Sequence, residues 1–331
     1  MTAHLWSIHA AGARAQTHPA HAIPGLAVGI VTLCWLLSAG VYIAAKWVVA
    51  DMPPWALGFW RTSLAALILL PVVWGHRRQM RDLLRKRAPE ILLVGGTGLC
   101  LSQGFIYTGL HYTTAVNAGL IMALMPILTM ILARFVLGEP MGTGQAAGSL
   151  VALCGMIVIV ARGDVASLLR VGINAGELWI VASALCFAIY SVLLRRAKFD
   201  LDPLPLLLLL LCAASLVAFP LYMWEIIDGQ RTHLNAGGFL ALAYVAAPGG
   251  ALMYYLFNWS IGALGAAKAG IFLYLQTVFV AVLAYFLLGE QLHFYHLEGA
   301  VLIAVGVLVV TLLKPRAAAP HAPSLASESG R

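Results

Sequence analysis

Polar side chains inside long apolar stretches are the residues of this sequence that could bind a solute. Gln103 and Tyr107 lie four positions apart, so they share one face of a helix. Gln276 lies near the middle of another apolar stretch, and its amide can both donate and accept hydrogen bonds. A polar group buried without a partner costs several kcal/mol, so residues of this kind mark candidate sites.

The candidate substrate-binding residues share an aromatic or amide side chain without net charge. They are Gln276, Gln103, Tyr107, Tyr254, Asn258, Trp35, Tyr42, Trp179, Tyr190 and Tyr274. Such a set predicts binding of a neutral or zwitterionic organic solute through hydrogen bonds and aromatic contacts. The structural alternative for each residue is a bond that ties two helices together, and for Trp179 it is an anchor at a membrane interface.

Three residues are candidates for a hinge or gate. Pro126 interrupts an apolar stretch near its middle, where it frees a backbone carbonyl. Pro248 and Gly249 interrupt a second stretch at a comparable depth. In lipid, an interrupted helix is tolerated only where it lines a cavity or is packed inside protein.

The sequence offers no obvious catalytic or metal-binding constellation. No Asp or Glu falls near the middle of an apolar stretch, and no glycine-rich phosphate loop is present. His293 and His296 are three positions apart without a nearby Cys or Asp, whereas tight metal sites usually need three or four ligands. We therefore predict no enzyme activity, no cofactor and no metal, and no process that ATP drives.

The composition indicates that lipid is the solvent of this chain. Of 331 residues, 62% are hydrophobic and only 10% are charged, whereas soluble domains carry about 25% charged residues. A bilayer core of about 30 Å needs roughly 20 apolar residues per helix, so the chain can supply about ten spans. The net charge of +7 is concentrated in short stretches between apolar segments, which argues against nucleic acid as a partner.

We predict an all-α polytopic membrane protein with about ten transmembrane helices. The expected spans are residues 25–45, 54–74, 91–111, 114–137, 143–161, 174–194, 203–224, 236–258, 265–288 and 294–313. Residues 1–23 and 315–331 are predicted to be disordered cytoplasmic tails.

Basic residues predict the orientation of the spans. With the N-terminus inside, the cytoplasmic side receives a basic loop formed by Arg77, Arg78, Arg81, Arg85, Lys86 and Arg87. The same side receives Arg195 and Arg196, whereas fewer basic residues fall on the opposite side. We therefore expect both termini in the cytoplasm and the protein in a bacterial cytoplasmic membrane.

The chain repeats itself with one ungapped offset. Gly138-Glu139 matches Gly289-Glu290, and 289 − 138 = 151. The same offset pairs further small and apolar residues: Ala115 with Ala266, Ala118 with Ala269, Gly119 with Gly270, Phe135 with Phe286, Gly148 with Gly299 and Gly155 with Gly306. We predict two five-helix repeats, residues 24–162 and 163–314. Five is odd, so the repeats enter the membrane in opposite directions, as in alternating-access transporters.

These features resemble the drug/metabolite transporter superfamily, and within it the EamA-type exporters, over roughly residues 25–313. The resemblance rests on the duplicated five-span unit, the Trp35 region, Pro53-Pro54 followed by Arg61, and the run from Ala115 to Ile121 leading to Pro126. Bacterial amino-acid exporters of the YddG type are similar in size and layout. The second half departs from the pattern, because its seventh span has no counterpart of Arg61.

The resemblance implies a secondary transporter that exports small metabolites, amino acids first among them, through a cavity between the repeats. Lys268 is the main charged exception in the expected lining, and a phosphate ester typically needs a cluster of Arg and Lys. A sugar-phosphate or nucleotide-sugar exchanger remains the alternative within the superfamily, and an intramembrane enzyme or a scaffold protein the alternative outside it. The expected partners are the substrate and the bilayer, with the chain acting as a monomer or a homodimer.

Overall fold

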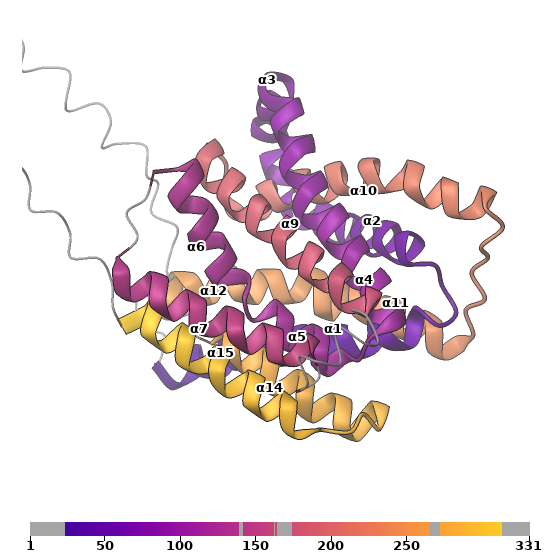
Figure 1. Ribbon diagram of the computed structural model, residues 1–331. Helices are drawn as coiled ribbons and strands as arrows, with labels where there is room; N and C mark the ends of the chain where they lie inside the picture. The colour runs from indigo at the N-terminus through magenta and orange to yellow at the C-terminus, as the bar shows by residue number, and fades with distance from the viewer. Residues whose placement is uncertain (1–23, 139–141, 162, 164–173, 265–271, 313–331) are drawn as a thin grey trace, which may run out of the picture.

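The fold is a bundle of helices with no strand among the residues that the structure describes (Figure 1). It comes from a computed structural model, which describes residues 24–138, 142–161, 163, 174–264 and 272–312. The predicted tails at residues 1–23 and 315–331, together with Glu139 and Lys268, lie outside these residues.

The described residues of the first half form nine helical elements. They are α1 (Pro24–Val48), α2 (Pro54–Val73), η1 (Trp74–His76), α3 (Arg77–Gly95), η2 (Gly96–Leu101), α4 (Ser102–Tyr112), α5 (Ala115–Met122), α6 (Met125–Val136) and α7 (Thr143–Val160). Pro54 starts α2 at a position where its missing N–H costs nothing, and the Thr114 hydroxyl caps α5 by accepting from the N–H of Asn117.

The described part of the second half follows the same order. Its elements are α9 (Ala175–Ala197), α10 (Pro203–Ile227), α11 (Ala236–Ala246), η3 (Ala247–Leu252), α12 (Met253–Leu264), α14 (Leu273–Leu283), η4 (Ala284–Leu288) and α15 (Phe294–Leu312). The side chains of Asn174 and Asn235 cap α9 and α11.

Four pairs of elements begin at the repeat offset of 151. α1 and α9 begin at 24 and 175, and η2 and η3 at 96 and 247. α4 and α12 begin at 102 and 253, and α7 and α15 at 143 and 294. The side-chain pattern that revealed the repeat in the sequence therefore corresponds to a repeat in the backbone.

The contacts between the halves also come in matched sets. α2 packs on its repeat twin α10, and α7 packs on its twin α15. α1 contacts α12 and α14, while α9 contacts α4, α5 and α6, which belong to the corresponding spans of the opposite half. Such reciprocal pairing is what a two-fold relation between the repeats requires.

Small residues bring α7 and α15 close together. A Cβ added at Gly155 would lie 2.7 Å from the carbonyl oxygen of Gly299, and one at Gly299 would lie 2.9 Å from that of Gly155. A Cβ added at Gly306 would lie 2.4 Å from the carbonyl oxygen of Gly148. The glycines that match across the repeat thus meet at one helix crossing, where lipid-embedded helices pack backbone to backbone.

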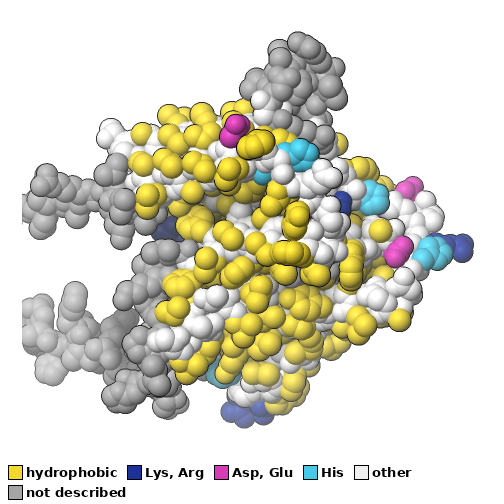
Figure 2. All heavy atoms as spheres, turned by 90° about the horizontal axis from the view of Figure 1, so that it is seen from below, with side chains coloured by type: hydrophobic (Ala, Val, Ile, Leu, Met, Phe, Trp, Pro, Cys, Tyr) yellow, Lys and Arg dark blue, Asp and Glu magenta, His cyan; other side chains and the backbone are white. Residues whose placement is uncertain are grey.

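Seven helices in the described residues are long and apolar enough to cross a membrane, judged by length and composition. The sequence-based expectation of about ten differs for two reasons. One continuous helix of 59 residues, Pro54–Tyr112, joins two expected spans, and the apolar helices Tyr274–Leu288 and Phe294–Val309 are shorter than a full span. Figure 2 shows a broad hydrophobic surface whose charged side chains gather near its edges.

The basic segment expected to be a loop is helical. Residues 77–87 form the first part of α3, which projects from the bundle in Figure 1. Arg, Lys, Leu and Gln are good helix formers, so the segment continues the helix instead of interrupting it. A kink lies at Arg87 (φ −137°), two residues before Pro89, which cannot take part in regular helical hydrogen bonding. The Arg87 guanidinium lies 4.6 Å from the ring centre of Phe199, beyond the end of α9.

Candidate functional site

A central cavity of about 250 Å³ lies between the two halves. It is lined from α1, α2, α4, α5, α6, α9, η3, α12 and α14, so both repeats contribute to its wall. The lining residues are Trp35, Ser38, Val41, Tyr42, Ala45, Arg61, Gln103, Ile106, Tyr107, Leu110, Met122, Met125, Phe187, Gly249, Met253, Tyr254, Phe257 and Gln276. Six of the ten candidate binding residues are therefore at this cavity.

One polar wall joins α2 to α4. Arg61 Nη1 donates to Gln103 Oε1 at 2.5 Å, and the Tyr107 hydroxyl donates to the same oxygen at 3.3 Å. Gln103 and Tyr107 share a helix face, as their spacing predicts. The side chain of Gln103 thereby fixes a guanidinium at the cavity surface.

Tyrosines from both repeats surround that guanidinium. Tyr42, Tyr107 and Tyr254 lie close enough to Arg61 to interact with it electrostatically. Tyr42 is also within hydrogen-bonding reach of Gln276, which approaches from α14. The polar part of the cavity therefore combines three phenols, two amides and one permanent positive charge.

The rest of the lining is aromatic and sulfur-containing. Trp35 packs edge-on against Phe257, with ring centres 5.2 Å apart. Met122 and Met125 flank the turn between α5 and α6, where thioether side chains offer an adaptable surface. The cavity therefore has a polar region and an apolar region, as an amphipathic solute requires.

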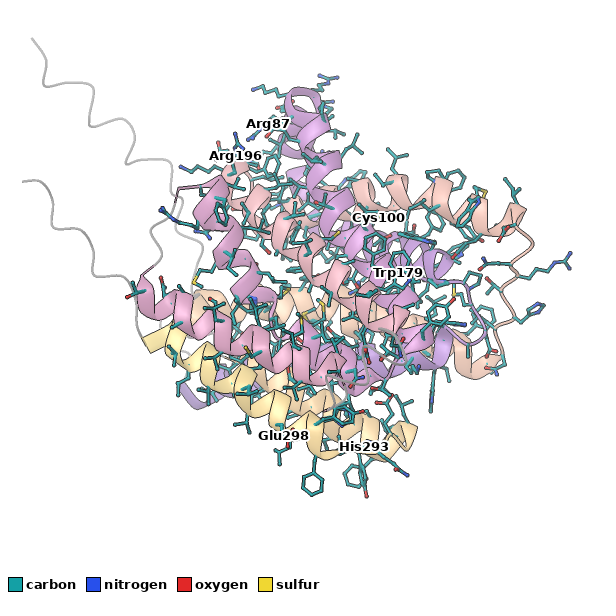
Figure 3. The ribbon with its side chains drawn as sticks, in the orientation of Figure 1. Arg87, Cys100, Trp179, Arg196, His293 and Glu298 are labelled. Carbon is teal, nitrogen blue, oxygen red and sulfur yellow. The ribbon has the colours of Figure 1, made fainter. Side chains whose placement is uncertain are left out.

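Three candidate residues lie away from this cavity. Trp179 lines a separate pit of about 550 Å³, and in Figure 3 it lies well along the molecule from Arg196 on the same helix. Tyr190 packs against Gly98 in η2, where an added Cβ would lie 2.2 Å from its ring. Tyr274 lines an apolar groove with Leu120 and Val278. The side chain of Asn258 lies outside the described part of the structure.

The hinge candidates occupy two kinds of irregularity. Pro126 lies in the first turn of α6, just after the chain leaves α5, so the expected interruption separates two short helices. At Pro248 and Gly249 the expected break is instead a π-helix, η3, through which the helical path continues. Gly249 lines the cavity, and an added Cβ would lie 2.2 Å from Val41. π-turns of this kind recur at functional sites.

Several lining residues were not among the sequence-based candidates. Arg61 has no counterpart in the second half, but its charge inside an apolar helix is itself a signal of a functional site. Ser38 shares a helix face with Trp35 and Tyr42, which indicated its placement. Phe187 and Phe257 gave no signal, because an aromatic residue in an apolar helix is equally at home against lipid.

A buried polar cluster lies beyond the cavity, where α5, α9 and α15 meet. Asn117 Nδ2 donates to Glu177 Oε1 at 2.9 Å, and Asn117 Oδ1 lies 3.0 Å from His296 Nε2. Lys46 Nζ donates to the carbonyl oxygens of Leu110 and Thr113, at 2.5 and 2.6 Å. These bonds tie α1, α4, α5, α9 and α15 together at one end of the bundle.

Two glutamates of the second half cap helices of the first. Glu290 accepts from the N–H groups of Ala115 and Val116, at 2.8 and 3.0 Å, at the start of α5. Glu225 does the same at the start of α2, accepting from Trp55 and Ala56 at 3.0 and 2.8 Å. A carboxylate at a helix N-terminus satisfies orphan donors and complements the helix dipole.

His293 and His296 serve a local structural role. The N–H of His293 donates to His296 Nδ1 at 2.9 Å, and His296 Nε2 faces Asn117. Within the described ranges, no group of three or more His, Cys, Asp or Glu side chains is placed to hold a metal ion.

Comparison with known proteins places the chain in a family. The EamA-like transporter family matches residues 25–161 and, a second time, residues 174–312. The chain belongs to the EamA-like transporter family. The two matched segments correspond to the two halves of the bundle. Because both halves contribute lining residues, the cavity lies between two EamA units.

Several curated relatives of this EamA protein are named as transporters or exporters. It is 29% identical to the uncharacterized transporter YyaM of Bacillus subtilis, over 83% of this chain and 90% of the relative. It is 22% identical to an S-adenosylmethionine uptake transporter of Rickettsia felis, over 88% and 94% of the two chains. It is 27% identical to a probable terminal-alkyne amino-acid exporter of Streptantibioticus cattleyicolor, over 75% and 80%.

A solved crystal structure has the same fold. It matches with a TM-score of 0.57 at 22% identity, covering 87% of this chain and 97% of the other. The family and these relatives identify a multi-pass membrane transporter, which agrees with the apolar helices of the bundle.

Proposed function

We propose that this EamA protein exports small neutral or zwitterionic metabolites, most of all amino acids, by alternating access through the central cavity. The observation that carries the proposal is the cavity itself, which lies between the two EamA units and combines a polar wall with an aromatic one. A volume of about 250 Å³ has room for several water molecules. That volume suits a small solute better than a nucleotide sugar.

Ten transmembrane helices in two inverted repeats, residues 24–162 and 163–314, fit this proposal. The 59-residue helix bends at Arg87, so α2 supplies one crossing, and the part of α3 after the kink, η2 and α4 supply another. α14 with η4 supplies the ninth crossing, and α15 supplies the tenth. The reciprocal helix contacts support a two-fold relation between the repeats. Five crossings per repeat would make the second repeat enter the membrane in the opposite direction to the first.

The placement of basic residues supports a cytoplasmic-membrane location with both termini inside. Arg87 and Arg196 lie near each other at one end of the molecule in Figure 3. His76, at the start of the basic segment, lies 3.5 Å from Asp202 in the connection between α9 and α10. The basic first part of α3 and the basic end of α9 thus lie at one end of the bundle. Under the positive-inside rule, such an end faces the cytoplasm.

The substrate class and the direction rest on chemistry and on the relatives. Of the described lining residues, Arg61 is the only Lys or Arg, whereas a phosphate ester typically needs a cluster of such residues. One relative is named as a probable amino-acid exporter, which favours amino acids and export, whereas another is named as an uptake transporter.

Counterflow into liposomes that contain only this protein tests the proposal. We expect labelled amino acids to accumulate against an unlabelled internal pool, and sugar phosphates to remain outside. Empty liposomes are the control. Exchange of phosphate esters without exchange of any amino acid would overturn the proposal.

A further inference from the structure

Two buried donors at the cavity lack hydrogen-bond acceptors. They are Arg61 Nε and Trp35 Nε1. Both residues line the cavity, and their exposed fractions are 7% and 8%. A buried donor without a partner bears the cost of losing water, so such groups mark places where an acceptor is supplied by something else.

The charge on Arg61 is unbalanced within the cavity. A guanidinium stays protonated in proteins, yet no Asp or Glu is among the described residues of the lining. Its partner, Gln103 Oε1, is a neutral oxygen. A permanent cation in an apolar surrounding is costly unless an anion accompanies it. The counter-ion is therefore missing from the described wall.

We propose that the substrate brings the counter-ion, a carboxylate that binds the Arg61 guanidinium. This inference rests on the proposed function and names the group by which the substrate is recognised. Arg61 offers planar donors that match a carboxylate, and Gln103 holds the guanidinium at the wall. The described lining holds no carboxylate for an ammonium group, so the acid group is required and the amine is dispensable.

The remaining lining sets the orientation of the substrate. Phe187, Met122 and Met125 present apolar surface to the same cavity. Under the repeat offset the twin of Arg61 is residue 212, because 61 + 151 = 212, and that residue is the exposed Cys212. The carboxylate therefore has a single docking point, toward α2, while the apolar part of the solute lies against the aromatic and thioether surface.

Binding of four matched probes tests the inference on the unmodified protein. The probes are phenylalanine, 3-phenylpropionate, 2-phenylethylamine and phenylalaninamide, and the readout is the unfolding temperature of the purified protein. We expect both carboxylates to stabilise the protein and the amine and the amide to have at least tenfold weaker apparent affinity. Equal stabilisation by amine and acid, or none by either acid, overturns the inference.

Transport of the same probes separates this inference from the proposed function. If the carboxylates bind selectively but neither acid is exchanged by counterflow, the proposed function fails and the carboxylate site stands. If phenylalanine is exchanged and the amine competes as well as 3-phenylpropionate, the proposed function stands and the carboxylate site is wrong.

Substitutions locate the site. Arg61→Gln should weaken 3-phenylpropionate binding at least tenfold and Arg61→Lys by less. Trp35→Phe should weaken it by a few-fold, because the N–H donor is lost together with part of the aromatic surface. Arg134→Gln removes an equal charge from an exposed position of α6 outside the cavity lining and should leave binding unchanged. Unaltered binding by Arg61→Gln protein overturns the inference, and the probe series on the unmodified protein decides the matter if that variant does not fold.

Discussion

Gln276 brings an uncharged amide to the central cavity. It lines the cavity from α14, within reach of Tyr42 of the opposite repeat. We predict that Gln276→Leu protein inserts and folds, because Leu is similar in size and compatible with the membrane. Transport should fall about 2- to 10-fold, since a neutral hydrogen bond contributes roughly 0.5–1.5 kcal/mol. Counterflow of the transported amino acid measures the effect.

A neighbour on the same helix provides the control for Gln276. Tyr274 lies two positions earlier but lines the apolar groove instead of the cavity. Tyr274→Phe should transport at the parental rate. If Gln276→Leu protein also does so for every substrate, Gln276 ties helices together and does not contact the solute.

The sequence could predict the depth of a polar residue but not the direction in which its side chain points. Gln103, Tyr107 and Gln276 lie at the cavity because an apolar helix retains amides and phenols mainly where they have partners. Trp179 and Tyr274 are also aromatic residues with a polar group in apolar helices, yet they line a separate pit and an apolar groove instead of the cavity. Substrate binding by each of the candidate residues stays a prediction.

At the scale of helices, the carboxylate of Glu290 holds the start of α5. It accepts from two backbone N–H groups of that helix. Glu290→Gln removes the charge and leaves one acceptor oxygen, so we expect a loss of about 1–2 kcal/mol of stability. A lower unfolding temperature in detergent would register it. Glu298→Gln is the matched control, because Glu298 is exposed on α15 and points outward in Figure 3.

The close packing of α7 on α15 depends on glycines at the crossing. Gly155→Ala would place a Cβ 2.7 Å from a backbone carbonyl of Gly299, and we expect a destabilisation of about 1–3 kcal/mol. Thermal unfolding of the purified variant measures it. Gly29→Ala in α1 meets nothing within 4 Å and should be neutral or slightly stabilising. Equal stability of the two variants would show that the crossing can relax.

The locations of helices followed from hydropathy, and two interruptions followed from Pro126 and Pro248, but the π-helical form of the turns did not. Apolar runs bounded by Pro and Gly indicated where helices begin and end. The π-helices η2 and η3 have no comparable signal, because a π-turn depends on packing against neighbours. The sequence of η3 contains Pro248 and two glycines, whereas η2 has glycines alone, so the shared geometry was visible only in the backbone.

At the scale of the whole molecule, the basic residues at one end of the bundle predict the membrane topology. Reporters that are active only in the cytoplasm should be active when fused to either terminus, because the basic residues near Arg87 and Arg196 share one end of the bundle. A reporter inserted after Gln230, in the connection between α10 and α11, should be inactive. A C-terminus on the outside would mean an odd number of crossings.

The π-helices η2 and η3 affect how the length of a span relates to the direction of its side chains. η2 and η3 span residues 96–101 and 247–252, so each repeat carries its wide turn at the same position, directly before the helix that bears Tyr107 or Tyr254. A π-turn holds one residue more than an α-turn, so it absorbs an extra residue and leaves the helix beyond it facing in nearly the same direction. Removing one residue from such a turn would therefore let it close as an ordinary α-helix with the binding side chains of the span still directed at the cavity. Removing one residue from the α-helix beyond the turn would instead rotate the side chains after the deletion by about 100° relative to those before it. In these two spans the same deletion is therefore tolerated or disruptive according to its position relative to the π-turn.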